Sequence, residues 1–201
     1  MAEVTQPGPV PENACIREAV CIHTQKILDS CLDKDCIEDL RVYLTRDSQN
    51  CLERATSVKA RSAELLYVYI DVESVPFNCG FFTVDLTFYY KVLADVMVGT
   101  LRPTTVYGLA IFSKRVMLYG SEGSAKIFTS RVNSDGPDQQ LMAQSNKPMA
   151  VVEVVDPVLL DAKVVETDNN CCDCCGDVPE SIGQCFDDEL VTSGDGRRLL
   201  V

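Results

Sequence analysis

The middle of the chain alternates apolar and polar residues over a long stretch. In residues 82–98 every even position is apolar, and polar residues such as Thr83, Asp85 and Thr87 lie between them. A period of two places alternate side chains on opposite faces of a strand, so this stretch predicts a β-strand with one buried face. Because 17 residues exceed the usual strand length, we expect a bend or bulge along it.

Other segments carry similar strand signals. The candidate strands are residues 38–45, 51–59, 66–72, 104–119, 125–132, 149–155 and 158–166. The segment Gly120–Gly123 between two of them is interpreted as a turn rather than a phosphate-binding loop. Seven or eight such runs predict a mainly β chain: an antiparallel β-sandwich or barrel-like domain with little helix. A helix is expected only near residues 16–30, where apolar residues form a fragmentary stripe.

Charge is unevenly distributed along the 201 residues of the chain. The net charge is −12, and residues 133–201 hold 4 basic and 14 acidic residues, which contribute −10 of it. We therefore expect a flexible N-terminal arm over residues 1–14, a β-rich assembly domain over 15–166 and an acidic cysteine-rich tail over 167–201. A strongly acidic chain repels phosphate, which argues against nucleic-acid binding.

The N-terminal sequence lacks the basic and apolar regions of a signal peptide, and no uncharged apolar stretch approaches 18 residues. These features predict synthesis in the cytoplasm without a signal peptide and no membrane insertion. Thiols are normally reduced in that compartment. Eleven cysteines are then explained either by metal binding or by later exposure to an oxidising environment.

Residue patterns for catalysis are nearly absent. His23 is the only histidine, and its polar surroundings favour a surface position over a Cys–His nucleophile pair. Acidic groups such as Asp187-Asp188-Glu189 are expected to be solvated, whereas acid–base catalysis needs a desolvated pocket. We expect no enzyme, no catalytic residues and no cofactor. Two weaker alternatives are a redox C-x-x-C in the tail, which lacks a preceding strand, and a calcium site near Asp168–Asp177, which lacks EF-hand spacing.

The cysteines lie mainly near the two ends. Cys171, Cys172, Cys174 and Cys175 fall within five residues, and zinc held by these thiolates is the alternative hypothesis. Four thiolates so close together surround one ion only with severe backbone strain, so disulfides between copies are favoured. Cys79 and Cys51 are instead expected to be small buried residues. The cross-linking candidates are Cys15, Cys21, Cys31, Cys36, Cys171, Cys172, Cys174, Cys175 and Cys185.

Several segments resemble a known group of proteins. The stretches are Cys31–Leu44, Tyr69–Glu73, Val75–Asn78, Phe81–Asp85 and Gly120–Phe128. They are similar to segments of cysteine-rich spore coat and exosporium proteins of spore-forming clostridia, of the self-assembling CsxA type. The resemblance covers about residues 15–130 and carries over no catalytic residue.

The resemblance implies a structural protein that forms ordered sheets on the spore surface, stabilised by disulfides after the mother cell lyses. The resulting hypothesis is a self-assembling protein of a bacterial spore outer layer, which forms homo-oligomers or lattices cross-linked by intermolecular disulfides. Its expected partners are further copies of itself and other cysteine-rich spore proteins.

Overall fold

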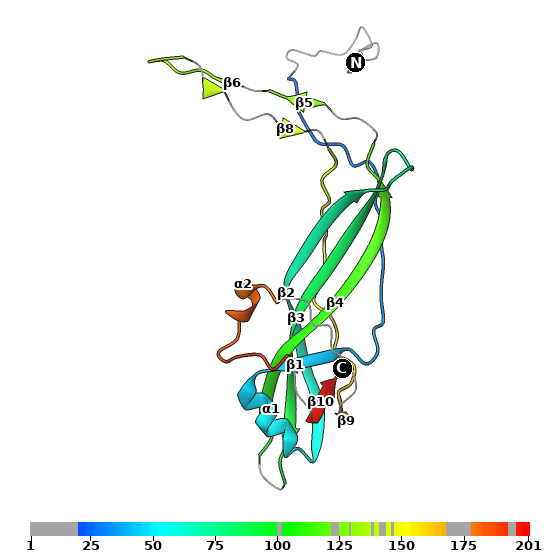
Figure 1. Ribbon diagram of the computed structural model, residues 1–201, viewed down its shortest axis with the longest axis vertical. Coiled ribbons are helices and arrows are strands. Elements are labelled where there is room, and N and C mark those ends of the chain that lie inside the picture. Colours follow the sequence, from blue (N-terminus) through cyan, green and yellow to red (C-terminus); the bar gives the residue numbers. More distant parts are fainter. Residues whose placement is uncertain are drawn as a thin grey trace, which may run out of the picture.

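The computed structural model describes residues 20–99, 102–121, 125–128, 130–137, 139–140, 144–145, 147–167, 178–192 and 196–201. Its centre is one six-stranded antiparallel sheet in the order β2-β3-β4-β1-β10-β9 (Figure 1). The chain is therefore mainly β and antiparallel, as predicted. The sheet curls but does not close into a barrel, since β2 and β9 remain its two edges.

Three long strands form a meander at one side of the sheet. They are β2 (Ser57–Ser74), β3 (Phe81–Met97) and β4 (Thr104–Tyr119), which confirm the strands predicted around 66–72, 82–98 and 104–119. β3 pairs with β4 in continuous register. The irregularity expected along β3 lies in its partner β2, where the register shifts between Ala60 and Ser62 and between Leu65 and Tyr67. Such bulges bend and twist a long strand pair.

Three short strands complete the sheet. β1 (Arg41–Leu44) pairs with β4 and with β10 (Gly196–Leu200), and β10 also pairs with β9 (Lys163–Thr167). Two small ribbons extend past the end of the meander (Figure 1). One joins β5 (Lys126–Ile127) to β8 (Gln144–Ser145), and the other joins β6 (Ser130–Arg131) to β7 (Gln139–Gln140).

The described residues contain two short helices, α1 (Arg46–Glu53) and α2 (Glu180–Gly183). Residues 20–30 form no helix, so the helix predicted near 16–30 is wrong over its described part. The predicted strand 51–59 is wrong in its first residues, because α1 runs to Glu53 and β2 begins only at Ser57. Thr45 precedes α1 in an extended conformation and Asp47 lies in its first turn, both favourable at a helix N-terminus.

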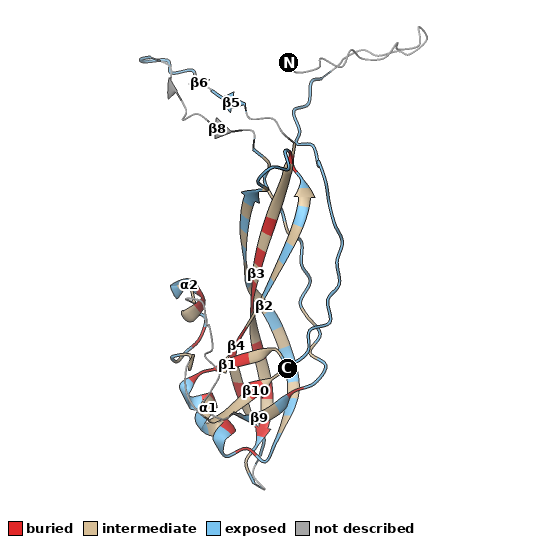
Figure 2. Cartoon of the chain, turned by 45° about the vertical axis from the view of Figure 1, so that its right-hand side comes forward, coloured by how far each residue is buried: buried red, intermediate tan, exposed pale blue. Residues whose placement is uncertain are grey.

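Two apolar clusters lie on one face of the meander. The main core fills the lower part, where all six strands and α1 meet; its buried members are Val42, Leu44, Leu52, Ala55, Val92, Ala94, Val96, Val106, Ala110, Ala162 and Leu199. Above it, residues 65–74, 81–90 and 111–119 continue as a three-stranded extension, here called the arm (Figure 2). Val84, Leu86 and Phe88 form the buried apolar cluster of the arm.

Residues 178–192 and 196–201, the described part of the predicted tail beyond β9, are not simply solvated. In this part, β10 lies inside the sheet between β1 and β9, and Leu199 is only 1% exposed. Ile182 and Phe186 are also buried, in a cluster with Tyr89 and Leu109 on the second face of the meander. Here a sequence that reads as acidic and polar supplies an interior strand and covers part of the sheet.

Candidate functional site

Two extended segments run beside the arm (Figures 1 and 2). Residues 20–39, here called the N-terminal strap, and residues 147–162, the C-terminal strap, contain no helix or strand. The C-terminal strap includes the predicted strand 149–155, which is extended but pairs with no strand among the described residues. The two straps share the apolar side of the arm, because each contacts side chains on that face.

Carboxylates fix the N-terminal strap. The Asp29 carboxylate accepts a 2.9 Å hydrogen bond from the backbone N–H of Tyr119, at the end of β4. Lys114 Nζ forms ion pairs with Asp33 and with Asp35, the latter at 2.5 Å. The hydrogen bond from Lys114 lowers the pKa of Asp33, and both carboxylates raise the pKa of Lys114. Asp39 pairs with Lys163, so the strap is held from Asp29 to Asp39.

Mainly apolar contacts fix the C-terminal strap. Ala150 and Val152 pack against the buried apolar cluster of the arm, and Leu159 and Ala162 pack on the main core. Between these contacts, Asp156 Oδ1 accepts a 3.0 Å hydrogen bond from the backbone N–H of Leu65. This strap is therefore anchored from the arm down to the main core.

The other sides of both straps are exposed and apolar. Leu32 is fully exposed at 101%, and Val155 is 86% exposed. The exposed apolar side chains of the N-terminal strap are Val20, Ile22, Ile27, Leu28, Leu32 and Ile37. Those of the C-terminal strap are Met149, Val151, Val154, Val155, Val158 and Leu160. These twelve residues are called the strap surface, and they are gathered on two segments of the chain, whereas exposed apolar residues on an ordinary protein surface are scattered singly.

The structure places five described cysteines on the surface. Cys21, Cys31 and Cys36 lie in the N-terminal strap, and Cys185 follows α2; all four were predicted as cross-linking candidates. Cys79, in the turn between β2 and β3, is also exposed, so its predicted burial is wrong. Short turns leave few atoms to cover a side chain, which explains this exposure.

Cys51 is half-buried against the main core, close to the burial expected for it. No disulfide links the six cysteines in the described part of the chain. The remaining candidates, Cys15, Cys171, Cys172, Cys174 and Cys175, lie outside the described residues.

The zinc alternative therefore falls outside the described residues. Within the described ranges, no group of three or more His, Cys, Asp or Glu side chains is placed to hold a metal ion. His23 is exposed in the N-terminal strap, as expected for a surface histidine.

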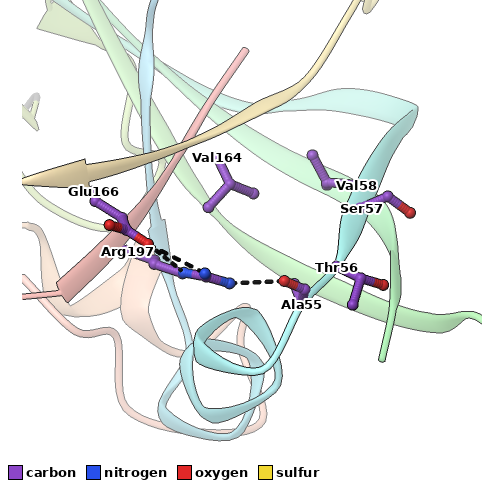
Figure 3. A pocket seen from close by; sticks show the side chains of 7 residues that line it. All are labelled: Ala55, Thr56, Ser57, Val58, Val164, Glu166 and Arg197. Atoms are coloured by element: carbon purple, nitrogen blue, oxygen red, sulfur yellow. Dashed lines mark hydrogen bonds and ion pairs between the residues drawn. The ribbon is translucent and has the colours of Figure 1, made fainter. Parts of the chain in front are cut away.

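A hollow of about 370 Å³ opens between the start of β2 and the edge strand β9 (Figure 3). Its one basic group, Arg197, is engaged by its own walls: Nη1 donates to the Ala55 carbonyl at 2.7 Å, and Nη2 pairs with Glu166 at 3.2 Å. These contacts connect β10 with the end of α1 and with β9. The hollow is thus a junction between elements of the fold, and its two charged groups, Arg197 and Glu166, pair with each other.

The second face of the arm carries polar groups that pair with one another. Arg115 Nε and Nη2 donate to the Asp85 carboxylate at 2.5 and 2.7 Å, which lowers the pKa of Asp85 and raises that of Arg115. Beside this pair, the hydroxyls of Thr87 and Ser113 lie 3.3 Å apart and share a hydrogen bond. Exposed apolar side chains also lie on this face, among them Tyr67, Tyr69 and Met117, but they are fewer than those of the two straps.

Sequence reasoning identified the strap cysteines but not the strap surface. The available signal was the run Met149–Val155, in which only Glu153 is charged. Such a run is typical of a strand buried on both faces.

Comparison with known proteins gives no relatives: no family model, no curated protein and no solved structure matches the chain. In the parts of the chain that the structure describes, neither helix has the length and apolar character needed to span a membrane.

Proposed function

We propose that this chain is a structural protein that self-associates into oligomers or lattices whose copies are joined by intermolecular disulfides. The observation that carries the proposal is the set of exposed, unbridged cysteines in the described residues: Cys21, Cys31, Cys36, Cys79 and Cys185. Sulfurs that lie exposed on a folded chain are accessible to the sulfurs of a neighbouring copy.

The paired polar groups elsewhere support a structural role. Arg197 in the hollow and Arg115 on the arm are bound to carboxylates or carbonyls of the chain itself. The described hollow therefore presents no uncommitted basic group for a substrate, whereas the exposed apolar and thiol groups are suited to association.

The outer layer of a bacterial spore is the setting we propose. The resemblance of residues 15–130 to clostridial coat and exosporium proteins supports it, with synthesis in the cytoplasm followed by oxidation at the spore surface. Partners would be further copies of the chain and other cysteine-rich spore proteins.

Gel electrophoresis without and with reductant tests the proposal. After air oxidation, the wild-type chain should give a ladder of oligomers that reductant collapses to a monomer. Substituting Ser for the five exposed cysteines should weaken the ladder, whereas Cys51→Ser, at a half-buried position, should leave it unchanged. A monomer in both wild-type lanes would contradict the proposal.

The second candidate function is a soft-metal binding module, favoured by the four cysteines at positions 171, 172, 174 and 175. Elemental analysis of protein purified under reducing conditions separates the two functions. Near-stoichiometric zinc that is lost when these four cysteines are changed to Ser would favour the metal-binding module.

A further inference from the structure

We infer that the strap surface is the docking site for a second copy of this chain, and that the cysteines of the N-terminal strap cross-link copies joined there. This inference rests on the proposed function and deepens it, because it names the surface and the order of events. Apolar association comes first, and disulfides then fix the contact.

The C-terminal strap has the composition of a segment covered on both sides. Ala150 and Val152 pack on the arm of the same chain, while Val151 and Val155 are 74% and 86% exposed. A segment that is apolar on both sides is normally buried on both sides. Its own arm covers one side, so a second molecule is needed to cover the other.

The exposed area is sufficient for a stable contact. An aliphatic side chain exposes on the order of 100 Å², and most of the twelve residues of the strap surface are more than two-thirds exposed. Together they present roughly 500–1,000 Å² of apolar area. A standard interface buries about 800 Å² on each partner, and the largest apolar patch of a typical monomer is about 300–600 Å².

The two straps carry eight acidic and three basic residues, and part of this negative charge is paired within the chain. Five carboxylates are directed to groups of the same chain: Asp29, Asp33, Asp35, Asp39 and Asp156. The other charged residues of the two straps are balanced, with Lys26, Lys34 and Lys147 against Glu38, Glu153 and Asp161.

Two copies of a chain with net charge −12 repel each other over most of their surfaces. The contact between them must therefore use a region where charge is compensated. An apolar surface is also self-complementary, as a two-fold contact between identical patches requires. The strap surface meets the second condition, and the ion pairs of Asp33, Asp35 and Asp39 with Lys114 and Lys163 reduce the negative charge around it.

The decisive measurement is sedimentation velocity of the full chain in reductant, over a concentration series. Wild type should associate reversibly without any disulfide. The quadruple variant Ile27→Ser, Leu32→Ser, Val151→Ser and Val155→Ser should raise the dissociation constant by about 100-fold or more, because apolar contacts are lost on both copies.

The matched control carries four Ser substitutions at exposed apolar positions outside the straps: Tyr69, Met117, Phe128 and Val132. It should associate as wild type does. Hydrogen–deuterium exchange of the unaltered chain gives a readout that needs no variant: slower exchange in residues 20–39 and 147–162 at high concentration. A wild type that stays monomeric in reductant, a quadruple variant that associates normally, or unchanged exchange would overturn the docking site.

Oxidation tests the cysteine part separately. In mixed labelled and unlabelled chains, the first intermolecular disulfides should involve Cys21, Cys31 or Cys36, and their triple Ser variant should delay cross-linking. Changing Cys79 and Cys185 to Ser should not delay cross-linking. Equal delay in the two variants would contradict the role of the cysteines in the N-terminal strap. If chains cross-link on oxidation but do not associate in reductant, the strap surface is not the docking site, while the proposed function stands. If chains associate in reductant but do not cross-link on oxidation, the proposed function is contradicted, while the docking site stands.

Discussion

At the scale of single residues, Lys114 is the main link between the N-terminal strap and the arm. In the register of β3 and β4 it lies opposite Leu86, on the apolar face of the arm, and its side chain is only 18% exposed. A long lysine stem can cover apolar surface while its charged end reaches polar partners. Here those partners are the carboxylates of Asp33 and Asp35, so one side chain serves both surfaces.

Replacing this amine tests how the N-terminal strap is held. Lys114→Met keeps the apolar stem and removes both ion pairs, so tryptic cleavage after Lys34 should become several-fold faster. Ion pairs to solvent-exposed carboxylates contribute little to stability, so the melting temperature should hardly change. Lys59→Met, at an exposed position of β2, is the control. Unchanged cleavage in Lys114→Met would show that other contacts hold the strap.

The same contact predicts the titration of Asp33. Because Lys114 lowers the pKa of this carboxyl below its ordinary value of 3.8, the contact is formed above pH 3.8 and is lost as pH falls through the lowered pKa. Carboxyl NMR of wild type should give an Asp33 midpoint below 3.8, and Lys114→Met should return it toward 3.8. Equal midpoints in the two proteins would contradict the assignment.

Gly108 marks the closest approach of two strands. A Cβ atom built at this position would clash with the carbonyl oxygen of Tyr43 in β1, a backbone atom that cannot rotate away. Gly108→Ala should therefore lower the free energy of unfolding by about 1–3 kcal/mol, measured by urea denaturation. Gly183→Ala, with nothing within 4 Å of its Cβ, should stay within about 0.5 kcal/mol of wild type.

At the scale of elements, the sequence predicts strands well where one face alone is buried. β2, β3 and β4 were found because their side chains alternate along the chain. β10 was missed because Arg197 and Arg198 make it look polar; its burial depends on β1 and β9, which lie far away in sequence. α1 was missed because eight residues give little helical periodicity.

The candidate site could also be predicted only in part from the sequence. The exposure of Cys21, Cys31 and Cys36 agrees with the prediction made from their position near one end of the chain, whereas the exposure of Cys79 was not predicted. The strap surface could not be predicted, because an apolar run gives no information on which of its sides the same chain covers.

Two adjacent leucines test the role of β10. Leu199 is 1% exposed in the main core, whereas Leu200 is only partly buried. Leu199→Ala should cost about 2–5 kcal/mol of unfolding free energy, as core truncations do, and Leu200→Ala should cost clearly less. Thermal and urea denaturation measure both. Equal, small effects would mean that β10 does not belong to the cooperative core.

At the scale of the whole molecule, a curled body carries a long arm with apolar straps on one side (Figure 2). The net charge of −12 opposes contact between copies, and salt shortens the Debye length from about 30 Å at 0.01 M to about 3 Å at 1 M. Added salt should therefore tighten association of the reduced chain, followed by sedimentation velocity. Weaker association at high salt would indicate a contact made by ion pairs instead of the strap surface.

The strand order has a consequence for how the molecule forms on a ribosome. The meander β2-β3-β4 is contiguous in sequence and can pair as soon as it emerges, but β9 pairs in this sheet only with β10, which is translated some thirty residues later. During that interval β9 has no strand partner in the sheet, and part of the main core is exposed. Slow synthesis of the codons between β9 and β10 would prolong this incomplete state and favour premature contacts between nascent chains.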